Sequence, residues 1–179
     1  MDTIQVLDKT FVISIRDEEI QEAVSRLAQE ISRDYRDKNP LFLVMLNGAF
    51  VFAADLLRQV TLPCEISFVK YVSYTGMASS HQVNQLIGLG EEVTGRNIVV
   101  VEDIIDTGFS MASLLEDLRL MSPRSIAVCS LLFKPDAFRR DFRINYLGLS
   151  IPNDFIVGYG LDYDRYGRNY KDIYKVAGN

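Results

Sequence analysis

Several features that would direct the search for a function are missing or rare in this sequence. Its 179 residues include two cysteines and one histidine, and no segment approaches the roughly 18 consecutive apolar residues of a membrane-spanning helix. The N-terminus also lacks a basic stretch followed by a long apolar one. We therefore expect a soluble, cytoplasmic protein with no membrane partner.

The cysteines and the histidine are interpreted as structural or solvated residues. Cys64 and Cys129 both lie in apolar, strand-like segments, which favours buried free thiols in a reducing compartment over a disulfide. His81 lies in the polar stretch Tyr74–Asn84, which is long enough for a mobile loop, so we interpret it as a solvated residue rather than a catalyst.

Positive charge is also in short supply. Lysine and arginine together number 19 against 24 aspartates and glutamates, which gives a net charge of −5 and a pI near 4.9. No run of basic residues has the density of a nucleic-acid-binding stripe. This composition disfavours nucleic acids and other polyanions as the main ligand.

The length and a hydrophobic content of 48% suit one compact domain over residues 1–179. Apolar residues on one face predict an amphipathic helix over Asp17–Tyr35, with Asp17 as its N-cap. Short apolar runs alternate with further helical segments along the rest of the chain. The predicted strands are Phe11–Ile15, Leu41–Leu46, Ile66–Ser73, Ile98–Val101 and Ser125–Phe133, and the further helices are Phe50–Arg58 and Ser110–Met121.

This alternation predicts an α/β fold with a mostly parallel, twisted sheet that helices flank on both faces. In such sheets ligands bind at the carboxyl ends of the strands, so the residues directly after the apolar runs are the candidates for a site. We expect the core to span about residues 35–140. The tail from Tyr146 onward departs from the alternation, and with the N-terminal segment it is expected to form a small hood lobe over the site.

The clearest chemical pattern is the segment Val99–Ser110, an apolar strand that runs into acids and a hydroxyl-rich turn. Backbone N–H groups of Thr107–Ser110, at the start of a helix, can form a nest for a phosphate. Glu102 and Asp103 can accept hydrogen bonds from ribose hydroxyls or hold a hydrated Mg²⁺. The segment therefore suits a ligand that carries both a phosphate and hydroxyl groups.

The order of residues in this segment resembles a known signature. An apolar run, two acids, two apolar residues, Asp-Thr-Gly and a final hydroxyl residue resemble the phosphoribosyl pyrophosphate motif of type I phosphoribosyltransferases. A capped helix with solvated acids would account for each residue singly but not for the whole string. By this resemblance Asp106 is the candidate general acid/base. The implied phosphoribosyl-binding residues are Glu102, Asp103, Asp106, Thr107, Gly108, Phe109 and Ser110.

Three later segments make the resemblance more specific. Leu131–Pro135, Pro152–Tyr163 and Arg168 resemble the corresponding parts of hypoxanthine-guanine phosphoribosyltransferases, and the likeness extends over about residues 41–176. It implies an enzyme that joins the phosphoribosyl group of phosphoribosyl pyrophosphate to N9 of hypoxanthine or guanine. The products are IMP or GMP and pyrophosphate, and we expect a homodimer or homotetramer.

The resemblance assigns the purine site to two segments. Lys134 would donate a hydrogen bond to the 6-oxo group of the base, and Phe155 would stack on the purine ring. Backbone groups of Ile156 and Val157 would meet the edge of the ring. A solvated lysine and a core phenylalanine are the plainer alternatives.

The same resemblance places pyrophosphate between a turn and the hood. The turn is Leu46-Asn47-Gly48, which in family members often contains a non-proline cis peptide, and some relatives carry lysine in place of Asn47. Arg168 would contact pyrophosphate and Asp162 would bind a metal ion, with plain surface charges as the alternative for both. The implied Mg²⁺ ligands are Glu102, Asp103 and Asp162.

Two further positions complete the comparison. Ser73 and Tyr74 match the start of a mobile lid that closes over the reacting centre. Phe109 stands where a lysine often occurs, but a phosphate nest made of backbone groups does not depend on that side chain. Two rival functions remain: a phosphoribosyltransferase for another base, such as xanthine, uracil or orotate, and a non-catalytic sensor of phosphoribosyl pyrophosphate or nucleotides.

Overall fold

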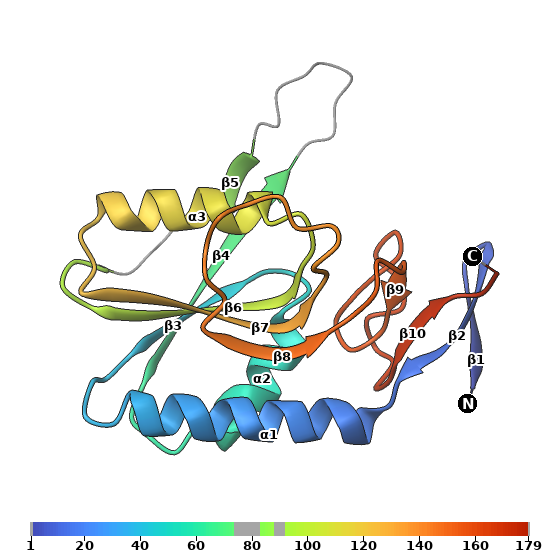
Figure 1. The fold of residues 1–179 in the computed structure, drawn as a ribbon, viewed down its shortest axis with the longest axis horizontal. Helices are drawn as coiled ribbons and strands as arrows, with labels where there is room; N and C mark the ends of the chain where they lie inside the picture. Colours follow the sequence, from blue (N-terminus) through green and yellow to red (C-terminus); the bar gives the residue numbers. More distant parts are fainter. Residues whose placement is uncertain (1, 74–82, 88–91, 179) are drawn as a thin grey trace.

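The structure, a computed structural model, describes residues 2–73, 83–87 and 92–178. Its main sheet has six strands, in the order β5 (Val83–Ile87), β4 (Glu65–Ser73), β3 (Leu41–Met45), β6 (Asn97–Ile105), β7 (Ser125–Phe133) and β8 (Tyr146–Ser150). β5 is antiparallel to β4, and the other neighbours are parallel. α3 (Phe109–Leu120) covers one face, and α1 (Asp17–Asp34) and α2 (Phe50–Gln59) cover the other (Figure 1).

The central strand β6 illustrates why both faces of the sheet are covered. Val99 and Val101 pack in the core cluster that contains α1 and α2, while Ile98 and Val100 pack in the cluster that contains α3. All four side chains are fully buried. A strand of β-branched residues that is buried on both faces is typical of a parallel sheet. The predicted α/β fold is therefore confirmed.

The predicted amphipathic helix is α1, but its N-terminus is capped differently from the prediction. Asp17 is the first residue of the helix rather than its N-cap, and the N-cap residue Arg16 makes no side-chain capping bond. Instead, the backbone N–H of Asp17 donates to Oδ1 of Asp172, at 2.8 Å. The capping group thus comes from the other end of the chain, where no local pattern could reveal it.

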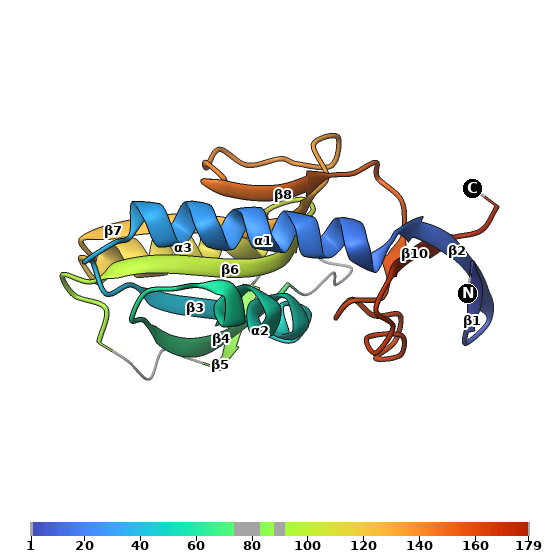
Figure 2. The same ribbon diagram turned by 90° about the horizontal axis from the view of Figure 1, so that it is seen from below.

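The N-terminal and C-terminal segments together form a second, smaller sheet. Its strands are antiparallel, in the order β1 (Thr3–Val6), β2 (Lys9–Ile15), β10 (Ile173–Val176) and β9 (Ile156–Val157). Figures 1 and 2 show this sheet beyond one end of the main sheet, with both chain termini in it. We call this sheet the hood, and its own core consists of Ile4, Val6, Phe11, Val157 and Tyr174.

The boundary between core and hood differs from the predicted one. β8 pairs in parallel with β7 at the edge of the main sheet, and α1 packs against it. The main-sheet unit therefore runs from Asp17 to Ser150 and is wider than the expected core of about residues 35–140. The sequence alone places Tyr146–Ser150 in the hood, which is wrong.

Residues 74–82 of the predicted lid, which include Tyr74 and His81, lie outside the described residues. Ser73 is the last residue of β4. Val83 and Asn84 belong to β5 rather than to the predicted loop.

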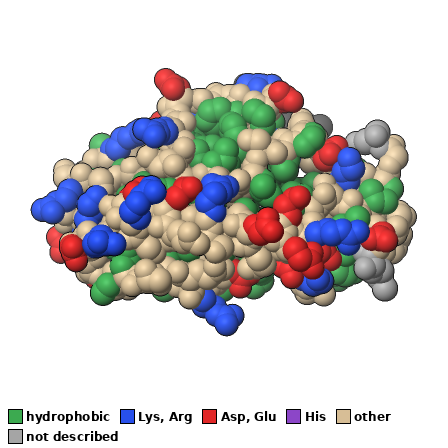
Figure 3. All heavy atoms as spheres, turned by 60° about the horizontal axis from the view of Figure 1, so that its bottom comes forward, with side chains coloured by type: hydrophobic (Ala, Val, Ile, Leu, Met, Phe, Trp, Pro, Cys, Tyr) green, Lys and Arg blue, Asp and Glu red, His purple; other side chains and the backbone are tan. Residues whose placement is uncertain are grey.

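No helix in the described part of the chain is both long and apolar enough to cross a bilayer. Figure 3 shows basic and acidic side chains interspersed over the face on which α1 lies.

Candidate active site

A cleft of about 590 Å³ opens at the carboxyl ends of the parallel strands, where the hood meets the main sheet. Its volume is in the usual range for pockets that bind small molecules. The walls come from the ends of β3, β4 and β6, the start of α3 and the hood loop after β9. The predicted site residues that line it are Leu46, Asn47, Gly48, Glu102, Asp103, Asp106, Thr107, Gly108, Phe109, Ser110, Asp162 and Arg168.

The predicted phosphate turn, Thr107–Ser110, connects β6 to α3 and lines the cleft. Gly108 is the N-cap residue with a φ of 83°, and no side chain caps the helix. A Cβ at this position would lie 2.7 Å from the ring of Phe138, so both the backbone conformation and the available space require glycine. The turn therefore meets the cleft at the N-terminus of α3, the end of a helix at which an anion is stabilised.

Glu102 and Asp103 form a shielded acidic pair beside the pyrophosphate turn, Leu46-Asn47-Gly48. Asp103 is 7% exposed, and a Cβ on Gly48 would overlap its carboxylate. Burial, and after it the negative charge of Asp103, raises the pKa of Glu102 well above its ordinary value. Burial likewise raises the pKa of Asp103. The pair thus resists carrying two bare negative charges, and it suits a cation or hydroxyl donors.

The pyrophosphate turn is held against β4. Its Leu46–Asn47 peptide bond is cis, a non-proline cis peptide of the kind that the family resemblance implies for this turn. The backbone N–H of Leu46 donates to the carbonyl of Val69, at 2.8 Å. The ammonium group of Lys70 donates to Oδ1 of Asn47, at 3.2 Å. Backbone and side chain of β4 therefore both fix the position of the turn.

On the hood side of the cleft, Asp162 and Arg168 form an ion pair with an N–O distance of 2.7 Å. The Arg168 guanidinium also donates to the carbonyl of Gly160, at 2.6 Å. The other carboxylate oxygen of Asp162 accepts a hydrogen bond from the backbone N–H of Arg165, at 2.7 Å. The two predicted residues are thus brought together and are held in fixed orientations.

Lys134 and Asp106 are neighbours at the ends of β7 and β6. The ammonium group lies 3.0 Å from the Asp106 carboxylate, and the Lys134 side chain is 8% exposed against 45% for Asp106. The parallel register that pairs Ile105 with Phe133 places the two side chains side by side. The candidate acid/base and the candidate reader of the 6-oxo group therefore touch, although Lys134 itself does not line the cleft.

Phe155, Ile156 and Val157 lie in the hood and do not line the cleft as the structure describes it. Phe155 is 43% exposed, and its ring packs edge-on against Tyr163, with ring centroids 5.5 Å apart. Ile156 and Val157 are buried in β9, which is the edge strand of the hood sheet. The exposed ring and the strand edge suit the predicted contacts with a base, and the purine role of the three residues stays a prediction.

Sequence reasoning missed several residues of the site. Lys70 and Arg165 line the cleft. Tyr159 anchors the hood loop, because its hydroxyl donates to Asp55 of α2 at 2.7 Å. The one available signal was the position of Lys70 near the carboxyl end of the predicted strand Ile66–Ser73.

The candidate metal ligands do not form a ready-made cage. Among the described residues, no group of three histidine, cysteine or acidic side chains converges closely enough to hold a metal ion. Mg²⁺ usually keeps several waters and binds through one or two carboxylates together with phosphates of the substrate. The hard oxygen donors of Glu102, Asp103 and Asp162 therefore fit Mg²⁺ by their chemistry, and the ion itself stays a prediction.

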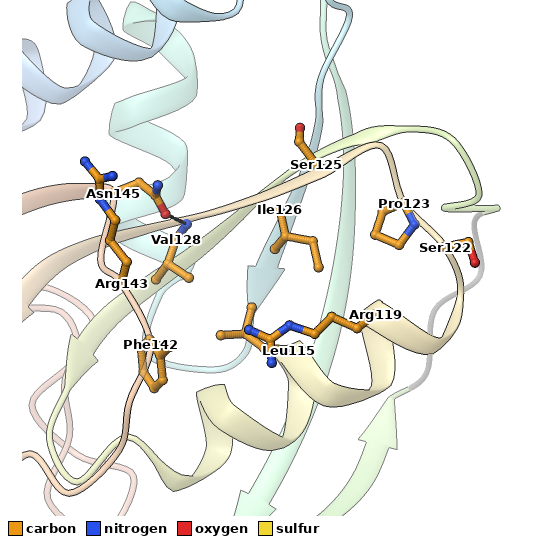
Figure 4. Close-up of a pocket in the computed structure, with 10 residues that line it drawn as sticks. All are labelled: Leu115, Arg119, Ser122, Pro123, Ser125, Ile126, Val128, Phe142, Arg143 and Asn145. Carbon is orange, nitrogen blue, oxygen red and sulfur yellow. Dashed lines mark hydrogen bonds between the residues drawn. The ribbon is translucent and has the colours of Figure 1, made fainter.

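A second hollow, of about 400 Å³, lies near the C-terminal end of α3 and the start of β7 (Figure 4). The side chain of Arg119 reaches toward Leu115, whereas that of Arg143 points away from it. The amide oxygen of Asn145 already accepts the backbone N–H of Val128, at 3.0 Å. The polar groups thus do not converge, and the cleft at the carboxyl ends is the better candidate.

The family model described as "Phosphoribosyl transferase domain" matches residues 15–164. The chain is 40% identical to the hypoxanthine-guanine phosphoribosyltransferase of Mycobacterium avium over 163 residues, which cover 87% of this chain and 79% of that protein. It is 38% identical to the hypoxanthine phosphoribosyltransferase of Salmonella typhimurium, covering 94% of this chain and 96% of that protein. A crystal structure of a hypoxanthine-guanine phosphoribosyltransferase from Bacillus anthracis superposes with a TM-score of 0.88 at 36% identity, covering 92% of this chain and 98% of that one. This chain therefore belongs to the phosphoribosyl transferase family, and within it to the hypoxanthine-guanine phosphoribosyltransferases.

Proposed function

We propose that this chain is a purine salvage enzyme that transfers the 5-phosphoribosyl group of phosphoribosyl pyrophosphate to N9 of hypoxanthine or guanine. The products are IMP or GMP and pyrophosphate. The observation that carries the proposal is the meeting of the turn at the start of α3, a shielded acidic pair and the Asp106–Lys134 pair at one end of the sheet. Each of these features suits a different part of the two substrates.

The phosphate turn and the acidic pair would position the ribose phosphate. The 5′-phosphate would accept hydrogen bonds from N–H groups of Thr107–Ser110 at the start of α3. Glu102 and Asp103 would accept hydrogen bonds from the ribose hydroxyls. These contacts hold the anomeric carbon in place beside Asp106.

The reaction is a displacement at the anomeric carbon, in which purine N9 attacks as pyrophosphate leaves. Carboxylates near the ribose stabilise the positive charge of an oxocarbenium-like transition state. Arg168 would stabilise the negative charge that grows on the leaving pyrophosphate. Asp106 would exchange a proton with purine N7, and Lys134 would donate to the 6-oxo group.

The proposal includes Mg²⁺, with Glu102, Asp103 and Asp162 as the residues that would hold it. When bound, the ion neutralises charge on the pyrophosphate oxygens. We also propose that a lid containing Ser73 and Tyr74 closes over the reacting centre, which would exclude water from the transition state.

We further propose a homodimer or homotetramer in the cytoplasm. Support for assembly comes from three exposed apolar side chains, Phe50 at the start of α2 and Ile66 and Phe68 on β4, each more than 40% exposed. Support for a reducing compartment comes from Cys64 and Cys129, both free thiols. Light scattering of the purified protein would measure the oligomeric state, and a monodisperse monomer would contradict the first of these proposals.

The test of the proposed function is turnover of purified protein with phosphoribosyl pyrophosphate, hypoxanthine and Mg²⁺. We expect IMP and pyrophosphate to form in equal amounts. A sensor that had kept only the fold would bind phosphoribosyl pyrophosphate without forming either product, and that outcome would overturn the proposal.

A further inference from the structure

The pyrophosphate turn of this chain carries no charged side chain, because Asn47 stands where some relatives have lysine. A lysine nevertheless lies beside it, since the ammonium group of Lys70 donates to Oδ1 of Asn47 at 3.2 Å. We propose that Lys70 supplies the positive charge for pyrophosphate that Asn47 lacks, and that Asn47 holds its ammonium group in position. This inference rests on the proposed function, because it assigns a residue to the pyrophosphate end of the same site.

Lys70 is well placed for this role by the geometry of β4. The strand alternates between faces, so that Val69 and Tyr71 are buried in the core cluster with α3, while Lys70 points to the opposite side. The carbonyl of Val69 accepts the backbone N–H of Leu46, so the residue before Lys70 is bonded to the turn itself. Lys70 and Asn47 both line the cleft.

Within the described part of the chain, no acidic side chain compensates the charge of Lys70. Its hydrogen-bond partner is a neutral amide, and no carboxylate of the described residues lies within ion-pair distance of it. The guanidinium of Arg168, by contrast, is already paired with Asp162 at 2.7 Å. The electrostatic attraction of a polyanion to Lys70 is therefore less offset by a neighbouring carboxylate than its attraction to Arg168.

Lys70 and Arg168 approach the cleft from opposite sides. Lys70 lies on the main sheet, and Arg168 lies in the hood and donates to the carbonyl of Gly160. A Cβ on Gly160 would overlap the carbonyl oxygen of Gly48, so the hood loop packs directly on the pyrophosphate turn. The two cations can therefore flank one bound pyrophosphate.

The experiment compares Lys70→Gln with wild-type protein in steady-state kinetics with hypoxanthine and in direct binding of pyrophosphate and of IMP, both with Mg²⁺. Loss of one charge-assisted contact predicts that pyrophosphate affinity falls about ten- to a hundredfold, with a matching rise in KM for phosphoribosyl pyrophosphate. IMP has no pyrophosphate group, so its affinity should stay within about twofold of wild type. Lys38→Gln removes the same charge at the far end of the strands and should change neither affinity.

A lysine at position 47 in the Lys70→Gln variant tests whether the lost affinity is due to the missing charge or to altered packing. The double variant Asn47→Lys with Lys70→Gln should recover most of the lost pyrophosphate affinity, whereas Asn47→Leu alone should weaken it by releasing the ammonium group. Lys70→Gln that binds pyrophosphate like wild type, or that loses IMP and pyrophosphate affinity equally, would overturn the inference. Wild-type protein without turnover on any base would instead overturn the proposed function, so the two failures are distinguishable.

Discussion

The ammonium group of Lys134 lies 3.0 Å from the carboxylate of Asp106, with the lysine buried and the aspartate half-exposed. The pair links the two residues for which we propose the most specific roles, reading of the 6-oxo group and proton exchange at N7. Because N7 and the 6-oxo group are adjacent on a purine, two neighbouring side chains can serve both at once. Substitutions of the two residues should therefore have different effects on the reaction.

Asp106→Asn should lower kcat by about 10²–10⁴-fold, because an amide cannot exchange a proton with the base. Binding of phosphoribosyl pyrophosphate should change little, since the phosphate turn is built from backbone groups that the substitution leaves in place. Ser110→Ala should instead leave kcat nearly unchanged and mainly raise KM for phosphoribosyl pyrophosphate. Steady-state kinetics and direct binding on both variants check the contrast, after thermal melts have excluded misfolding. A kcat for Asp106→Asn near that of wild type would contradict the assignment of Asp106 as the general acid/base.

Lys134→Gln should reduce the preference for 6-oxopurines over adenine by about ten- to a hundredfold, because the 6-amino group of adenine cannot accept the hydrogen bond that the lysine donates. Affinity for phosphoribosyl pyrophosphate should be retained. Lys171→Gln, at an exposed lysine of the hood, is a matched control for the loss of charge. The ratio of kcat/KM for hypoxanthine to that for adenine is the quantity to measure. An unchanged ratio would show that Lys134 does not read the base.

Gly48→Ala should disrupt the pyrophosphate turn, because its Cβ would overlap the carboxylate of Asp103. We expect a loss of about 1–3 kcal/mol in the free energy of unfolding and weaker binding of pyrophosphate. Ala54→Ser also adds one heavy atom, but on the exposed side of α2, and should change neither quantity. Denaturant unfolding and pyrophosphate titration measure the two effects. Wild-type behaviour of Gly48→Ala in both would contradict the close packing of the turn on Asp103.

Glu102→Gln should stabilise the metal-free protein at neutral and higher pH while it impairs catalysis. The pKa of Glu102 is raised in the folded state by burial and by Asp103, so the folded protein takes up this proton more readily than the unfolded one. This carboxyl therefore costs stability above its folded pKa, and the cost disappears as the pH falls through that value. Thermal melts in EDTA at a series of falling pH values should show Tm rising on acidification in wild type and a flatter profile in Glu102→Gln. The gain at the upper pH should be about 1 kcal/mol, or ~2–4 °C. A variant with a lower Tm than wild type at every pH would contradict the assignment, and Glu116→Gln on the exposed side of α3 is the control.

The parts of this molecule that sequence predicted correctly are those encoded in contiguous residues. The period of apolar residues in α1 and the β-branched run of β6 each depend on one short segment, and so does the turn from β6 into α3. β8 was missed because the connection from β7 contains no helix, whereas crossovers between parallel strands usually do.

The contacts that sequence could not supply join segments far apart in the chain. Asp172 caps a helix that begins at Asp17. Lys70 reaches Asn47 only because β4 lies beside β3, and Lys134 meets Asp106 only through the register of β7 on β6. Residue type and local spacing do not determine strand order or register, so contacts between distant segments can be identified only in the folded structure.

We propose that the cleft at the ends of the parallel strands joins a phosphoribosyl group to a 6-oxopurine. Initial rates with hypoxanthine, guanine, xanthine, adenine and uracil, at fixed phosphoribosyl pyrophosphate and Mg²⁺, test it most directly. We expect hypoxanthine or guanine, or both, to have the highest kcat/KM, at least about tenfold above adenine and uracil. Faster turnover of adenine or uracil, or no turnover of any base by folded protein, would contradict it.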